Sequence, residues 1–201
     1  PQLAGHGTAI EDMIPTRWAD WSADAEKAFQ ALSKRAKKIV VMGLSMGGAL
    51  TLWMAAQHPE ACGIVCINPA TQPQPQEVID MLQEMIDGGM VTTDGIGSDI
   101  ADPSAHETAY SGTPLGAMKS FLSDGLAPLA PRYPSIKMPM LLYTSVQDHV
   151  VQPGDSDAVA ATYGGPVERV MLERSYHVAT QDYDKDIIFA GAVAFVHRVT
   201  A

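Results

Sequence analysis

The chain of 201 residues has the length of one ordinary domain, and 46% of its residues are hydrophobic, which is enough to build a buried core. Its formal net charge of -10 leaves no extended basic surface, so nucleic acid is not an expected partner. No apolar run is long enough to cross a bilayer, and no leader peptide opens the chain, so we expect a soluble, cytoplasmic protein.

The first third of the chain predicts a helix followed by a strand–helix–strand unit. Apolar residues recur every three or four positions from Trp18 to Leu32, which indicates an amphipathic helix with Thr16 as its N-cap. Apolar runs at 39–43 and 63–67 read as buried strands, and the helical stretch between them ends before His58-Pro59. Such a unit forms a right-handed crossover in a parallel sheet.

Between residues 70 and 135 the pattern changes, because Pro, Gly and Met accumulate and no strand-like run appears. Helical spacing is present around 78–85 and 115–122, so we expect short helices joined by flexible glycine segments. The methionines of this region suit either a core or contacts with a ligand. We interpret 70–135 as a cap or lid inserted over the sheet.

The sheet resumes in the last third, with strands expected at 140–144 and 167–172 and helices at 153–162 and 185–198. The predicted fold class is therefore α/β, with a mostly parallel sheet flanked by helices. Residues 1–69 and 136–201 would form its core and 70–135 its small helical cap. Cys62 and Cys66 lie too far apart along one strand for a relaxed disulfide and are expected to be reduced core residues.

Residues 43–48, Gly-Leu-Ser-Met-Gly-Gly, stand between a predicted strand and a predicted helix. A sharp turn at this place would lift the Ser45 hydroxyl clear of the backbone as a nucleophile, with Gly43 and Gly47 avoiding collisions on either side. The N–H of Met46, at the start of the helix, would then point to a developing oxyanion. The alternative is a plain glycine-rich connection.

A nucleophilic serine needs a base at the same edge of the sheet, and two loops offer one. Asp148 follows the strand at 140–144 and His177 follows the strand at 167–172, which gives the chain order Ser, Asp, His. His177 would take the serine proton while Asp148 fixes its tautomer. His149 is the rival base, but its place beside Asp148 makes it a poor partner for that carboxylate. The remaining histidines are expected to be solvated or structural.

Several motifs resemble the bacterial carboxylesterase and monoacylglycerol lipase family of the α/β-hydrolases. They are G-L-S-M-G-G at 43–48, D-H-V-V at 148–151, S-Y-H-V-A-T at 175–180 and L-A-G-H-G-T at 3–8, where Ala4 replaces the family's proline. The resemblance covers nearly the whole chain. It implies an α/β-hydrolase fold, a triad of Ser45, Asp148 and His177, an oxyanion donor at Met46 and a lid over an acyl pocket.

The front of the chain departs from that family. Members have earlier strands and an H-G-F-type loop that supplies a second oxyanion donor, and these would precede Pro1. We therefore expect that the N-terminal strands are missing and that this segment alone is poorly stable and weakly active.

The favoured function is hydrolysis of a carboxylic ester with one medium or long acyl chain, such as a monoacylglycerol, through an acyl-enzyme. No cofactor and no metal are expected. The substrate is a small ester or lipid, and transient contact with a membrane surface is compatible with it. The alternatives are a thioesterase, an acyltransferase, a carbon–carbon bond hydrolase, or an inactive fragment with the same fold.

Overall fold

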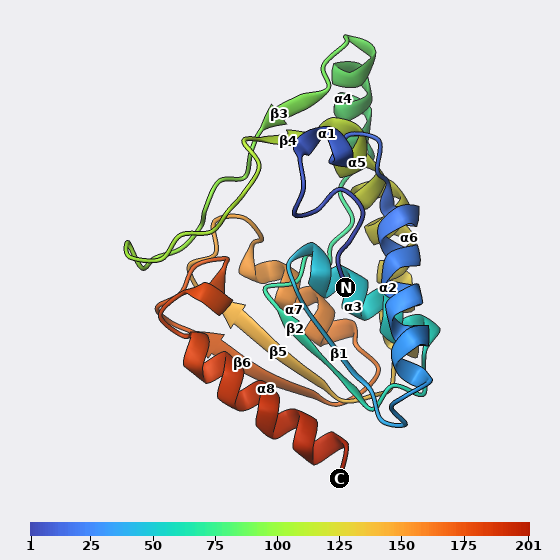
Figure 1. Cartoon of the computed structure of the whole chain (residues 1–201), viewed down its shortest axis with the longest axis vertical. Helices are drawn as coiled ribbons and strands as arrows, with labels where there is room; N and C mark the ends of the chain where they lie inside the picture. The colour runs from blue at the N-terminus through green and yellow to red at the C-terminus, as the bar shows by residue number, and fades with distance from the viewer.

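The computed structural model describes residues 1–201, and its centre is a four-stranded parallel sheet. The strands β1 (Val40–Leu44), β2 (Gly63–Ile67), β5 (Met140–Ser145) and β6 (Val167–Leu172) lie side by side in the order β1-β2-β5-β6 (Figure 1). In their register Leu44 pairs with Ile67, Ile67 with Tyr143, and Ser145 with Leu172. The loops that follow all four strands therefore meet at one edge of the sheet.

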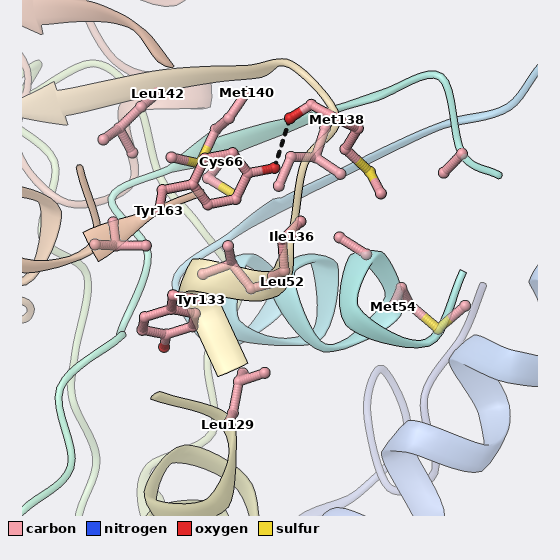
Figure 2. Packing of buried hydrophobic residues seen from close by; sticks show 14 of the residues in the cluster. Leu52, Met54, Cys66, Leu129, Tyr133, Ile136, Met138, Met140, Leu142 and Tyr163 are labelled. Atoms are coloured by element: carbon pink, nitrogen blue, oxygen red, sulfur yellow. Dashed lines mark hydrogen bonds between the residues drawn. The ribbon is translucent and has the colours of Figure 1, made fainter. Parts of the chain in front are cut away.

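Helices cover both faces of this sheet. One face packs against α3 (Met46–Gln57) and α7 (Pro153–Thr162), and α2 (Trp18–Ser33) packs on the outer side of α3. Figure 2 shows the resulting core, to which Leu52, Met54, Met140 and Tyr163 belong. The hydroxyl of Tyr163 donates there to the carbonyl of Met138 at 2.9 Å. The other face packs against α8 (Lys185–Val199).

The alternation of side chains along the strands explains the two cores. In β2, Ile64 and Cys66 belong to the core shared with α3, while Val65 and Ile67 point to the core shared with α8. All five residues of β2 are buried, as expected for a parallel strand with helices on both sides. Cys66 is fully buried, whereas Cys62, just before the strand, is half-buried.

Residues 70–135 add no strand to the sheet. They contain α4 (Gln76–Asp87), β3 (Thr92–Asp94), β4 (Gly112–Pro114) and α5 (Leu115–Ser120), followed by the π-helical η1 (Phe121–Leu126), α6 (Ala127–Leu129) and the 3-10 helix η2 (Ala130–Ser135). In Figure 1, α4, β3 and β4 extend beyond the edge at which the sheet strands end. The expectation that no strand occurs here is wrong, because β3 and β4 form a short antiparallel pair of their own.

The other predicted elements are confirmed, most of them within one residue at each end. The bounds of β2, β6 and α7 agree with the prediction, and α8 ends one residue later than expected. Two elements were not anticipated, namely the single turn α1 (Ile10–Met13) and the 3-10 turn η3 (Ala179–Gln181). None of the helices is long and apolar enough to span a membrane.

The predicted N-cap of α2 is wrong by one residue. The helix begins at Trp18, so its N-cap is Arg17, whose N–H donates to the carboxylate of Asp20 at 2.8 Å. The hydroxyl of Thr16 instead donates back to the carbonyl of Met13 at 2.7 Å. The inner face is otherwise as predicted, although Leu32, in the last turn, is 38% exposed.

Candidate active site

Ser45 occupies the turn between β1 and α3 in a strained backbone conformation. Its φ of 58° and ψ of -121° lie in a region of backbone angles that residues other than glycine rarely adopt. Hydrogen bonds to neighbouring residues keep Ser45 in this conformation. The Ser45 N–H donates to the carbonyl of Ile67 at 3.0 Å, and the Ser45 carbonyl accepts from the N–H groups of Gly48 and Ala49. The turn thus projects the Ser45 side chain from the edge of the sheet where the loops converge.

The crowding around this turn differs from the prediction at one glycine. A Cβ on Gly43 would lie 2.1 Å from the carbonyl oxygen of Gly47, so glycine is required there. A Cβ on Gly47 would meet nothing within 4 Å, so the predicted collision at Gly47 is wrong. The crowded glycine of the helix is Gly48, where a Cβ would lie 2.6 Å from the side chain of Pro69.

Asp148 and His177 lie on different loops and meet in the interior. Nδ1 of His177 is 2.8 Å from Oδ2 of Asp148, and only 7% and 2% of their side chains, respectively, are exposed. The second carboxylate oxygen of Asp148 accepts the N–H groups of Val150 and Val151 at 2.9 and 2.8 Å. A carboxylate can only accept here, so Nδ1 carries a proton and Nε2 is the ring nitrogen left to act as a base.

Asn68, which directly follows β2, binds the loop that carries His177. The Asn68 amide donates to the carbonyl of His177 at 2.8 Å and to the hydroxyl of Ser145 at 2.9 Å. Its oxygen accepts the N–H of Ser145 at 2.7 Å. Asn68 is buried and has a positive φ of 44°, a conformation that asparagine tolerates better than most residues.

Two further carboxylates hold the same loop from the side of α8. Asp182 is fully buried and accepts the N–H groups of Tyr176 and Tyr183, together with those of Ala101 and Asp102. Asp184 accepts the N–H groups of residues 174 and 175. Although burial alone would raise the pKa of Asp184, the hydrogen bonds from Arg174 and Ser175 lower it.

His149, the rival base, pairs with a different carboxylate. Its Nδ1 lies 2.8 Å from Oδ1 of Asp99, and 60% of its side chain is exposed. Asp99 also accepts the backbone N–H groups of His149 and His177. Burial alone would raise the pKa of Asp99, but these hydrogen bonds outweigh it and hold the pKa below its usual value. His149 is therefore not placed to act through Asp148.

Ser45, Met46 and His177 line one cavity of about 570 Å³, within the size range of small-molecule sites. Most of its lining residues are hydrophobic, and α5 and η1 contribute a wall of Ala117, Met118, Phe121, Leu122 and Leu126. Glu107 is one of its few acidic residues, and burial raises the pKa of that carboxyl. The cavity thus combines an apolar chamber with a few polar side chains.

The other histidines fall into three settings. His6 lines the cavity, with its ring edge-on to Trp21 and Nδ1 3.1 Å from the carbonyl of Ala4. His58 lies outside it, between the carboxylates of Glu26 and Glu60. The remaining two, at positions 106 and 197, are exposed.

Sequence reasoning missed four residues that hold the loops of the site, namely Asn68, Asp99, Asp182 and Asp184. Asn68 could have been found, because it follows a parallel strand at the same edge as the predicted residues. Asp99 and Asp182 carry no such signal, since each lies in a loop whose path the periodicity of the sequence does not determine.

A parallel sheet between helices, with a strained serine turn at its carboxyl-terminal edge, is the architecture of the α/β-hydrolase fold. The family model described as "Serine aminopeptidase, S33" matches residues 3–93. The thermostable monoacylglycerol lipase of Bacillus sp. strain H-257 is 38% identical over 97% of this chain and 77% of that protein. The carboxylesterase of Bacillus subtilis strain 168 is 22% identical over 99% of this chain and 80% of that protein.

Solved structures agree with these relatives. One, described as belonging to the metagenome-derived lipolytic enzymes LipS and LipT, superposes with a TM-score of 0.91 at 38% identity, covering 98% of this chain and 80% of that one. The monoacylglycerol lipase of Paleococcus ferrophilus has a TM-score of 0.70 at 16% identity over 92% of this chain and 75% of that one, which supports the fold. The chain belongs to the bacterial carboxylesterase and monoacylglycerol lipase family of the α/β-hydrolases. It is therefore an enzyme of the ester hydrolase class.

Proposed function

We propose that this enzyme hydrolyses carboxylic esters with one medium or long acyl chain, such as monoacylglycerols, through a Ser45–His177–Asp148 triad. The observation that carries the proposal is the 2.8 Å hydrogen bond between the buried His177 and Asp148, at the wall of a cavity that Ser45 also lines. His177 takes the proton from Ser45 as the hydroxyl attacks the ester carbonyl, and Asp148 stabilises the imidazolium that results.

The oxyanion of the tetrahedral intermediate is assigned to the N–H of Met46. Met46 is the first residue of α3, so its N–H has no acceptor within the helix and lies at the positive end of the helix dipole. Collapse of the intermediate leaves the acyl group on Ser45 and transfers the proton from His177 to the departing alkoxide. Water then repeats the sequence and releases the acid.

The substrate class follows from the shape and chemistry of the cavity. Its apolar wall suits an acyl chain, whereas Glu107, Gln72 and Gln74 offer polar groups for the hydroxyls of a glycerol moiety. Residues 70–135 supply much of that wall, and we assign them the role of a cap over the acyl pocket. The monoacylglycerol lipase among the relatives supports the same substrate class.

The test is covalent labelling with a fluorophosphonate, followed by the intact mass of the protein. We expect one adduct on the native chain and none on Ser45→Ala. Ser135→Ala, which changes an exposed serine that does not line the cavity, should also give one adduct. Hydrolysis of glycerol monoesters should fall at least about a thousandfold in Ser45→Ala. A folded native chain that takes no label, or labelling that survives Ser45→Ala, contradicts the proposed nucleophile.

The substrate class needs a separate assay. Glycerol monoesters of increasing acyl length should give a kcat/KM that rises with length until the apolar chamber is filled. Thioesters, and alcohols or thiols offered as acceptors in place of water, distinguish a thioesterase or an acyltransferase. Preference for one of these over glycerol esters would reassign the substrate while leaving the triad in place.

A further inference from the structure

A single carboxylate outside the proposed triad bridges the two loops that carry Asp148 and His177. Asp99 lies between β3 and β4, yet its Oδ2 accepts the N–H of His177 at 3.0 Å and that of His149 at 3.1 Å. The backbone carbonyl of Asp99 also accepts the N–H of Val178 at 3.0 Å. Only 14% of the Asp99 side chain is exposed, and its hydrogen bond to the N–H of His177 is partly buried, whereas the one to the N–H of His149 is exposed.

These loops also contact each other directly. The side-chain amide of Gln147 donates to the carbonyl of Glu173 at 3.1 Å, and the hydroxyl of Ser145 donates to the carbonyl of Tyr176 at 2.8 Å. Neither of these hydrogen bonds involves His177 itself. Asp148 and its neighbours follow β5, whereas His177 follows β6 after a separate loop. The hydrogen bond between Asp148 and His177 requires both side chains to be placed within a few tenths of an ångström, and reaction geometry is sensitive to errors of about 1 Å. One oxygen that binds a backbone N–H from each loop fixes them to a common point.

We propose that Asp99 is a positioning residue for the reaction, which holds the Asp148 and His177 loops in register so that the imidazole faces Ser45. The inference rests on the proposed function. Asp99 acts through the backbone of both loops and does not exchange a proton with the substrate. Because it belongs to the segment between β3 and β4, it also makes the geometry of the triad depend on the region assigned as the cap.

Asparagine distinguishes this role from a requirement for charge. The amide oxygen of Asp99→Asn can accept both backbone N–H groups at the position of Oδ2, and its NH₂ can donate to a neutral His149 ring. We therefore expect Asp99→Asn to keep kcat within about threefold of the native value. Asp99→Ala, which removes every side-chain acceptor, should lower kcat by about tenfold to a hundredfold with little change in KM.

Asp102 provides a matched control in the same segment. Its carboxylate accepts only from the N–H and hydroxyl of Ser104, within its own turn, and does not contact either loop. Asp102→Ala removes an equal charge three residues away and is expected to leave kcat unchanged. A comparable loss of kcat in Asp102→Ala would show that the effect is one of segment charge or order, which would overturn the proposal.

The split between kcat and KM decides between positioning and substrate binding, because Asp99 also lines the cavity. A rise in KM at constant kcat in Asp99→Ala would make Asp99 a substrate contact, and native kinetics in a folded variant would assign it no role. If Asp99→Ala does not fold, Asp99→Asn and Asp99→Glu are compared instead. The longer side chain of Asp99→Glu displaces the carboxylate oxygens by one methylene, so this variant should have a kcat about tenfold lower. Equal kcat values in Asp99→Asn and Asp99→Glu would contradict the inference.

Failure of this inference and failure of the proposed function are distinguishable. If Ser45→Ala abolishes hydrolysis while Asp99→Ala leaves kcat unchanged, only the role of Asp99 is wrong. If Ser45→Ala keeps the activity, the proposed triad is wrong whatever Asp99 does. The rate of fluorophosphonate labelling gives an independent measure, because it reports activation of Ser45 without a glycerol ester, and it should fall in Asp99→Ala in proportion to kcat.

Discussion

Gly43 and Gly47 occupy equivalent places on either side of Ser45, yet the structure predicts opposite effects of the same substitution. A Cβ on Gly43 would lie 2.1 Å from the carbonyl oxygen and 2.3 Å from the carbonyl carbon of Gly47, and 2.8 Å from the hydroxyl of Thr51. The first two of these atoms are backbone, so no rotamer change relieves the overlap. A Cβ on Gly47 meets nothing within 4 Å.

The magnitudes follow from this difference. Overpacking costs typically 1–3 kcal/mol, and the backbone contacts place Gly43→Ala at the upper end, at about 3 kcal/mol. For a chain of this length, that corresponds to a fall in Tm of about 6–12 °C. Gly47→Ala replaces a helical glycine and is expected to stabilise by about 0.4–1 kcal/mol, which raises Tm by about 1–4 °C.

Thermal unfolding of the two variants, monitored by circular dichroism, tests these values. The rate of fluorophosphonate labelling reports whether Ser45 keeps its reactive position in the turn. We expect Gly43→Ala to label slowly, because separating β1 from α3 displaces Ser45, and Gly47→Ala to label at the native rate. Equal losses of Tm in the two variants would refute the reasoning, since they would mean that the motif requires both glycines for the same steric reason.

Three further predictions concern other parts of the molecule. Burial alone would lower the pKa of His58, but its hydrogen bonds to Glu26 and Glu60 outweigh burial and raise the pKa. The contribution of His58 to stability is therefore complete below the pKa it has in the unfolded chain, and is lost as pH rises through the pKa it has in the folded protein. The Tm difference between native and His58→Gln protein should therefore be larger near about pH 6 than near about pH 9, and an equal difference at both contradicts the ion pairs. Asn68→Ala leaves a buried N–H and carbonyl groups unpaired and should cost about 2–4 kcal/mol in urea unfolding, whereas a loss below about 1 kcal/mol would show that the loops reorganise. Leu122→Trp narrows the cavity at its apolar wall and should lower kcat/KM for long-chain esters by about tenfold relative to short-chain ones. An unchanged dependence of kcat/KM on chain length would mean that this wall does not contact the acyl chain.

The four strands of the sheet could be predicted because each is a short apolar run between turn signals. β2 is the clearest case, since Gly63–Ile67 is buried throughout and Asn68-Pro69 ends it. β3 and β4 could not be predicted, because Thr92–Asp94 and Gly112–Pro114 are only three residues long and mostly polar. Their pairing depends on how the chain between them folds back, and no local sequence pattern predicts that path.

The site shows the same division between local and long-range information. Placing Asp148 and His177 at one edge needed only the rule that loops after parallel strands converge, and the triad itself stays a prediction. Identifying Gly48 as the crowded glycine needs the position of Pro69, which comes from the loop after β2. The role of Asp99 likewise depends on contacts across at least fifty residues of sequence.

The acidic composition, from which no nucleic acid partner is expected, also has a structural role at the edge of the sheet. Asp99, Asp148, Asp155, Asp182 and Asp184 each accept two or more backbone N–H groups from loops at this edge. Carboxylates that bind these N–H groups hold the loops in place. For Asp99 and Asp184, whose pKa values are lowered, this stabilisation is present above the unfolded pKa and is lost as pH falls through the folded value. Acid should therefore loosen the loops of the proposed triad before it disrupts the apolar cores, because those cores contain no ionised group that must be protonated.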